Sequence, residues 1–148
     1  MIKLSVSGCQ GRMGQRIMAL ALQDKVFELA ALLESRQRPD VPDVLHGVPV
    51  AFDVLALKGS HVLIEFTSPE ATVEHLEACR KFGVNMVIGT TGLSQPQIAA
   101  IKKASSKIAI VFSSNMSVGV NLVFGLIRQA ALITDGNYAI RLTETHHV

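Results

Sequence analysis

The chain has 148 residues, 49% of them hydrophobic and 18% charged, and 14 Lys and Arg against 12 Asp and Glu leave a formal charge of +2. This composition supports one folded domain of ordinary size and excludes disorder of the whole chain. So small an excess of charge, without a basic cluster, argues against binding to nucleic acid or to a membrane surface.

Short apolar runs alternate with longer helical patterns along the chain. Strands are predicted at residues 2–7, 27–33, 48–52, 61–66, 84–88 and 108–112, and helices at 12–23, 68–82, 94–105 and from 115 or 117 to about 133. The apolar runs at 63–64, 86–88 and 108–112 predict strands that are buried on both faces. The Pro- and Gly-containing segment 35–47 is predicted to be a surface loop. Strand–helix alternation of this kind predicts an α/β fold, a Rossmann-like doubly wound parallel sheet.

The C-terminal part is predicted to add a turn at residues 135–137 and a last strand at 138–145, where apolar and polar residues alternate. The first eight residues do not have the pattern of a signal peptide, because Lys3 and Ser5 interrupt a short apolar stretch. The apolar stretch 116–133 contains Asn121 and Arg128, so we expect no membrane span. Cys9 and Cys79 fit neither a disulfide framework nor a zinc motif, and we therefore expect a cytoplasmic protein without a metal site.

A glycine-rich loop follows the first predicted strand and leads into the first helix. Gly8, Gly11 and Gly14 have the spacing G-x-x-G-x-x-G, a variant of the dinucleotide fingerprint. Glycines permit a tight turn and a close approach of the backbone to a pyrophosphate, and the helix N-terminus favours the negative charge. The loop therefore predicts a dinucleotide site.

Glu34 ends the second predicted strand, twenty positions after Gly14, where an acidic residue accepts hydrogen bonds from the adenine ribose. Alternatively, Glu34 is a solvated loop carboxylate, but the glycine loop favours the ribose role. Arg12, Arg36 and Arg38 are candidates for holding the 2′-phosphate of NADPH. That Arg36 and Arg38 are merely solvated loop charges is an equally good interpretation.

Two further loops follow predicted strands on the same side of the sheet. Gly89-Thr90-Thr91-Gly92 offers small side chains against which a flat ring can lie, or is an ordinary turn. Residues 113–117 follow the next strand, and Asn115 or Ser117 alternatively caps the helix that begins there.

Five motifs occur in a fixed order, at residues 8–14, 65–70, 87–92, 115–121 and 144–147. Together they closely resemble the 4-hydroxy-tetrahydrodipicolinate (dihydrodipicolinate) reductases of bacterial and plant lysine biosynthesis, over essentially the whole chain. The resemblance implies a dinucleotide-binding domain at residues 1–116. Residues 117–148 would be the beginning, a helix plus a strand, of a mixed α+β domain for substrate binding and tetramerisation.

The resemblance also implies roles for individual residues. His146 matches the catalytic histidine, a proton donor or acceptor, and His147 matches its substrate-binding neighbour. NADH or NADPH would bind to Gly8, Cys9, Gln10, Gly11, Arg12, Met13, Glu34, Gly89, Thr90, Thr91, Ser113, Ser114, Asn115 and Met116. Ser35 stands where strong users of NADPH often carry arginine, so the choice of cofactor stays open.

The implied reaction is the NAD(P)H-dependent reduction of a cyclic dicarboxylate in the diaminopimelate route to lysine, by a homotetramer. In the family, a lysine and an Asp-Ala-Pro-Ser-Gly-Thr motif follow the paired histidines, whereas this sequence ends at Val148. We therefore expect the 148-residue chain to bind cofactor and to be catalytically incomplete. Two alternatives are another oxidoreductase, such as a relative of aspartate or homoserine dehydrogenase, and a non-catalytic nucleotide-binding module.

Overall fold

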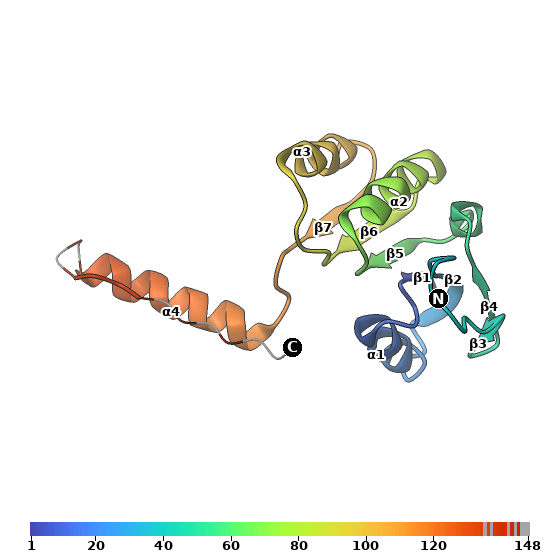
Figure 1. Ribbon diagram of the computed structural model, residues 1–148, viewed down its shortest axis with the longest axis horizontal. Helices are drawn as coiled ribbons and strands as arrows, with labels where there is room; N and C mark the ends of the chain where they lie inside the picture. The colour runs from blue at the N-terminus through green and yellow to red at the C-terminus, as the bar shows by residue number, and fades with distance from the viewer. Residues whose placement is uncertain (135, 137, 142, 144, 146–148) are drawn as a thin grey trace. The chain divides into compact units, whose positions relative to one another are not determined.

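A computed structural model describes residues 1–134, 136, 138–141, 143 and 145 of the chain (Figure 1). The chain divides into two compact units, one ending at Ser114 and the other beginning at Asn115.

The first unit contains a seven-stranded sheet with the strand order β3-β4-β2-β1-β5-β6-β7. Its strands are β1 (Ile2–Ser7), β2 (Phe27–Leu33), β3 (Val44–Leu45), β4 (Val48–Ala51), β5 (Val62–Glu65), β6 (Asn85–Ile88) and β7 (Ile110–Phe112). All neighbours pair in parallel except β3 and β4. Because the chain builds outward from β1 to one side and then returns to build β5 on the other, the sheet is doubly wound, as predicted.

Helices cover both faces of this sheet, as Figure 1 shows: α1 (Arg12–Ala21) lies on one side, and α2 (Pro69–Phe82) and α3 (Gln95–Ala104) on the other. Two buried clusters correspond to these faces. Leu4, Val6 and Met18 belong to the cluster beneath α1, and Leu63, Leu76 and Met86 to the cluster beneath α2 and α3. The alternation of side chains along each strand divides the core in this way.

Helix α2 begins and ends where its sequence predicts. The Ser68 hydroxyl accepts a hydrogen bond from the backbone N–H of Ala71 at 3.3 Å, and Pro69 takes the first helical position. Gly83 follows the helix in the left-handed conformation, with φ of 72°. These signals fix the position of the α2 N-terminus beside the carboxyl end of β5.

Three sequence-based expectations are wrong in detail. Strand β7 is not buried on both faces, because it is the last strand of the sheet order and Val111 is 59% exposed. The loop predicted at 35–47 contains β3, which forms a hairpin with β4, and residues 54–57 form a short 3-10 helix, η1 (Val54–Leu57). The described residues of the segment 138–145 form no strand, since a strand needs a partner to satisfy its backbone.

The second unit contains the helix α4 (Val118–Thr134), which has no buried residue. Val118, Leu122, Phe124, Leu126 and Ile133 are among its exposed apolar side chains. Within the part of the chain that the structure describes, no helix has the length and apolar character that crossing a bilayer requires.

Candidate functional site

A cavity of about 470 Å³ opens at the carboxyl ends of β1, β2 and β5. Gly8, Glu34, Arg36, Phe52, Thr67 and His75 are among the residues that line it. In doubly wound sheets, ligands bind at this edge, beside the strand where the winding reverses. The cavity therefore lies where the topology places a ligand site.

The glycine loop reaches the cavity at Gly8 and is held by the end of β2. The N–H groups of Gly8 and Cys9 donate to the Leu33 carbonyl at 2.9 and 3.2 Å, and the N–H of Gly11 donates to the Gly8 carbonyl at 2.9 Å. Gly8 has a φ of 66°, a conformation that favours glycine. Gly11 precedes α1 without a side-chain cap, so the backbone itself faces whatever binds at this helix end.

Glu34 connects the end of β2 to the glycine loop. Its Oε2 accepts a hydrogen bond from the N–H of Gln10 at 2.9 Å, and its Oε1 accepts one from the N–H of Ser35 at 3.0 Å. Each carboxylate oxygen retains a further acceptor site. Glu34 is thus built into the cavity wall and not left as a solvated loop carboxylate.

The two arginines that follow Glu34 have different surroundings. The Arg36 guanidinium lies 5.2 Å from the centre of the Phe52 ring, and both residues line the cavity. The Arg38 Nη2 donates to the carbonyl of Gln10 at 3.1 Å. Arg36 therefore faces the ligand space, whereas Arg38 stabilises the glycine loop.

The thiol of Cys9 lies beneath the loop and is fully buried. Burial, and next the negative charge of Glu34, raise the pKa of the Cys9 thiol to about 11. The thiol is thus kept protonated and unreactive, and Cys9 contributes its backbone to the loop.

The predicted loop at residues 89–92 is less open than its sequence indicates. Thr90 is buried, and its Oγ1 accepts a hydrogen bond from the N–H of Thr67 at 3.1 Å and shares one with the Thr72 hydroxyl at 2.9 Å. Gly89 lies against the Phe66 ring, which leaves no space for a Cβ atom. The Thr90 hydroxyl thus stabilises the start of α2, and only Thr91 of these residues has an exposed side chain.

The loop after β7 begins with Ser113, whose N–H donates to the Ile88 carbonyl at 3.2 Å, followed by the exposed Ser114. Asn115 and Met116 belong to the second unit. There, the Asn115 Oδ1 accepts from the N–H of Ser117 at 2.8 Å, and the Ser117 hydroxyl accepts from the N–H of Val120 at 3.4 Å. These bonds agree with the capping interpretation of Asn115 and Ser117, and the cofactor role of residues 113–116 stays a prediction.

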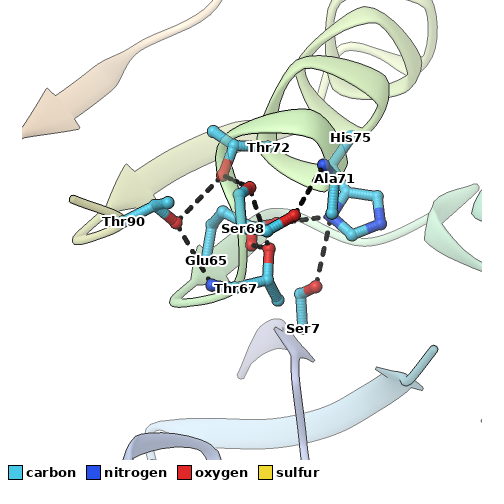
Figure 2. A network of polar contacts seen from close by, with 8 residues as sticks. All are labelled: Ser7, Glu65, Thr67, Ser68, Ala71, Thr72, His75 and Thr90. Atoms are coloured by element: carbon cyan, nitrogen blue, oxygen red, sulfur yellow. Dashed lines mark hydrogen bonds and ion pairs between the residues drawn. The ribbon is translucent and has the colours of Figure 1, made fainter. Parts of the chain in front are cut away.

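A buried polar network beside the cavity was missed by the sequence analysis (Figure 2). Glu65 is 0% exposed; its Oε2 lies 2.5 Å from the Nδ1 of His75, and its Oε1 accepts a hydrogen bond from the Thr67 hydroxyl. The Nδ1 of His75 also lies 3.1 Å from the Oγ of Ser7. Two features of the sequence could have indicated this network: Glu65 is a carboxylate in an otherwise apolar strand, and His75 lies on the apolar face of a helix.

The predicted catalytic residue His146 and its neighbour His147 lie outside the described residues, as does Glu144. Their roles stay predictions. Among the described residues, no three His, Cys, Asp or Glu side chains gather as metal ligands.

The doubly wound sheet and the glycine loop beside its carboxyl edge define a Rossmann-type dinucleotide-binding domain. A model of the family described as "Dihydrodipicolinate reductase, N-terminus" matches residues 2–116. The chain belongs to this family, as its motifs predicted.

Curated relatives named 4-hydroxy-tetrahydrodipicolinate reductase match nearly the whole chain. The protein from Nitrosomonas europaea is 41% identical over 99% of this chain, and that from Laribacter hongkongensis is 42% identical over the same share. In both cases the chain covers 58% of the relative's own length. The chain thus spans little more than half the length of these relatives.

Solved structures show the same fold. A dipicolinate-bound dihydrodipicolinate reductase from Paenisporosarcina sp. TG-14 superposes with a TM-score of 0.76 at 26% identity, over 88% of this chain and 54% of that one. A homoserine dehydrogenase from S. aureus, with a TM-score of 0.62, is only 14% identical over 76% of this chain and 32% of that one. The latter likeness concerns the fold alone, so the alternative of a dehydrogenase relative receives no further support.

Proposed function

We propose that this chain is the cofactor-binding part of an NAD(P)H-dependent reductase that converts 4-hydroxy-tetrahydrodipicolinate to tetrahydrodipicolinate in lysine biosynthesis. The observation that carries the proposal is the cavity that Gly8 of the glycine loop and Glu34 line, in a chain of this family. It has room for a large part of a dinucleotide.

The residues present fit such a cofactor. At the loop, Gly8 and Gly11 leave the backbone without side chains where a pyrophosphate approaches, and the N-terminus of α1 is free of a side-chain cap. At the end of β2, the remaining acceptor sites of the Glu34 carboxylate suit ribose hydroxyls. Arg36 suits a 2′-phosphate, since its guanidinium lies in the cavity wall.

These residues suggest how the chain serves the reaction. The loop and Glu34 bind and orient the cofactor, and loops 89–91 and 113–116 are proposed to border its reactive end. When bound, the reduced nicotinamide supplies the hydride. His146 is proposed to exchange a proton with the substrate and His147 to bind it, since histidine titrates near neutral pH.

The chain is proposed to use both NADH and NADPH. Glu34 favours the free ribose of NADH, because its carboxylate accepts hydrogen bonds from hydroxyls and repels a phosphate. Arg36 offsets this repulsion for NADPH. Ser35, with no charge, adds no preference for the phosphate.

Assembly and compartment are part of the same proposal. The exposed apolar side chains of α4 support burial of this helix in a homotetramer of the complete protein. The free cysteines Cys9 and Cys79 support a reducing, cytoplasmic compartment. The partners are a small cyclic dicarboxylate and further copies of the chain, without nucleic acid.

Calorimetric titration of the 148-residue chain with NADH and with NADPH tests the proposal. We expect saturable binding of at least one cofactor. Gly11→Val should abolish it, because a branched side chain would fill the space that the pyrophosphate needs. A folded wild-type chain that binds neither cofactor would overturn the proposal.

A further inference from the structure

His75 lies against the buried carboxylate of Glu65 (Figure 2), and it also lines the cavity. Its Nδ1 faces Glu65 at 2.5 Å, whereas no bond of its Nε2 to the described residues is found. Among the described residues, no buried side-chain nitrogen or oxygen lacks a hydrogen-bond partner. Because Nε2 has no such partner, it is not fully buried, and His75 is among the residues that line the cavity.

Glu65 determines what Nε2 offers to that cavity. A carboxylate only accepts hydrogen bonds, so the Nδ1 of His75 carries the proton and donates it to Glu65. In the neutral imidazole, the lone pair is then at Nε2. Glu65 cannot turn away, because its other oxygen accepts from the Thr67 hydroxyl and the whole side chain is buried. A neutral His75 therefore offers a nitrogen acceptor at Nε2, and Glu65 holds the ring in place.

The other walls of the cavity indicate which part of a dinucleotide reaches this acceptor. The glycine loop and Glu34 are assigned to the pyrophosphate and the ribose. Leu33, Phe52, Val54 and Ala71 also line the cavity and offer the apolar surface that a flat base needs. Ala71 and His75 lie one helical turn apart on α2, so His75 stands at the edge of this apolar region. Adenine carries one exocyclic donor, its 6-amino group.

We propose that His75 selects adenine, by accepting a hydrogen bond from the 6-amino group at its Nε2, and that Glu65 is the positioning residue that holds the ring in the required tautomer. This inference rests on the proposed function, because it assumes that the cavity binds the adenosine half of the cofactor.

The test compares the affinity of the 148-residue chain for NADH with its affinity for the hypoxanthine analogue of NADH, in which oxygen replaces the amino group. The wild-type chain should bind NADH more tightly by the factor typical of one hydrogen bond, about two- to tenfold. His75→Asn retains an N–H near the position of Nδ1 and removes Nε2. It should weaken the binding of NADH by that factor and leave the analogue unaffected, so that the ratio of the two affinities approaches one.

Glu74→Gln is the matched control, because Glu74 lines the same cavity from the same helix but is exposed. It should keep the wild-type ratio. Glu65→Gln should reduce the ratio even though Glu65 does not reach the cavity. A merely structural role of the pair predicts instead that the two ligands weaken equally in each variant.

The outcomes separate the two proposals. Failure of the wild-type chain to bind NADH would overturn the proposed function and this inference together. Binding of NADH with a wild-type ratio near one would overturn the inference alone, and so would a wild-type ratio retained in folded His75→Asn. If His75→Asn does not fold, the wild-type ratio and the Glu65→Gln variant decide the matter.

Discussion

Gly14 in the first turn of α1 lies directly over the peptide that follows Gly8. A Cβ atom on Gly14 would stand 2.8 Å from the Cα of Cys9 and nearer still to the carbonyl oxygen of Gly8. The helix and the loop therefore pack backbone against backbone. The third glycine of the motif thus serves helix packing, whereas the first permits the turn.

This contact predicts that Gly14→Ala destabilises the domain by about 1–3 kcal/mol, since the clash is with backbone atoms that cannot rotate away. Thermal unfolding followed by circular dichroism measures the effect. Gly125→Ala is the control, because a Cβ atom at this helical position meets nothing within 4 Å. That variant should be at least as stable as the wild type. Equal stability of Gly14→Ala and the wild type would contradict the packing.

Thr90→Val should lower the free energy of unfolding by about 1–3 kcal/mol, because it leaves the part-buried N–H of Thr67 without its partner and removes one of the two hydrogen bonds of the Thr72 hydroxyl, which keeps its bond to the Ser68 carbonyl. Thr91→Val alters an exposed side chain and should change stability by less than about 0.5 kcal/mol. Urea titrations of both variants make the comparison. If Thr91→Val lowers the free energy of unfolding more than Thr90→Val does, the Thr90 hydroxyl does not stabilise the fold as described.

Arg36→Ala should weaken the binding of NADPH by about tenfold and leave that of NADH nearly unchanged, because only NADPH carries a 2′-phosphate for the guanidinium. Arg38→Ala should weaken both cofactors to a similar degree, since Arg38 contacts the loop through the Gln10 carbonyl. Calorimetric titration of each variant with each cofactor gives the four affinities. If Arg36→Ala affects both cofactors equally, Arg36 does not contact the 2′-phosphate.

The two buried thiols should make the protein less stable at alkaline pH. Burial, and next the charge of Glu65, raise the pKa of the Cys79 thiol from 9.0 to about 12, and the pKa of Cys9 is raised to about 11. The folded state thus keeps both protons where the unfolded chain has released them. The free energy of unfolding is unaffected by these groups below pH 9 and falls as the pH rises from 9 towards 12.

Urea unfolding measured at a series of pH values from neutral to alkaline checks this prediction. The double variant Cys9→Ala and Cys79→Ala should have a smaller slope of unfolding free energy against pH in the alkaline range. Other titrating groups are common to both proteins and cancel in the comparison. Identical slopes would mean that the thiols are not buried as the structure has them.

The 148-residue chain should bind cofactor and reduce substrate far more slowly than a protein extended by the remaining length of its relatives. Holding the substrate against the nicotinamide accounts for about 7–11 kcal/mol of a barrier, and the family's substrate-binding motif follows the paired histidines. A coupled assay that generates the substrate in place and follows NAD(P)H absorbance compares the two proteins. In the extended protein, His146→Ala should reduce turnover by about 10²–10⁴-fold with little change in cofactor affinity. Equal rates for the two proteins would place the active site within the 148 residues.

Local signals in the sequence determined much of the fold and of the candidate site. The glycine spacing, the Ser68-Pro69 helix start and the Gly83 helix end act within a few residues, so they operate in any tertiary context. Strand β1 and helix α2 therefore lie where they were predicted. Glu34 was identified for the same reason, since its distance along the chain from the glycine loop is set by one βαβ unit.

Only the tertiary structure decided which polar groups meet. Strand β5 contributes Glu65, helix α2 contributes His75 and strand β1 contributes Ser7, and the pairing of β1 with β5 brings Ser7 to the other two. The internal use of the Thr90 hydroxyl and the exposure of β7 have the same origin. A hydrogen bond between distant segments depends on which strands pair, and burial depends on what covers a strand, and neither is encoded in the periodicity of a single segment.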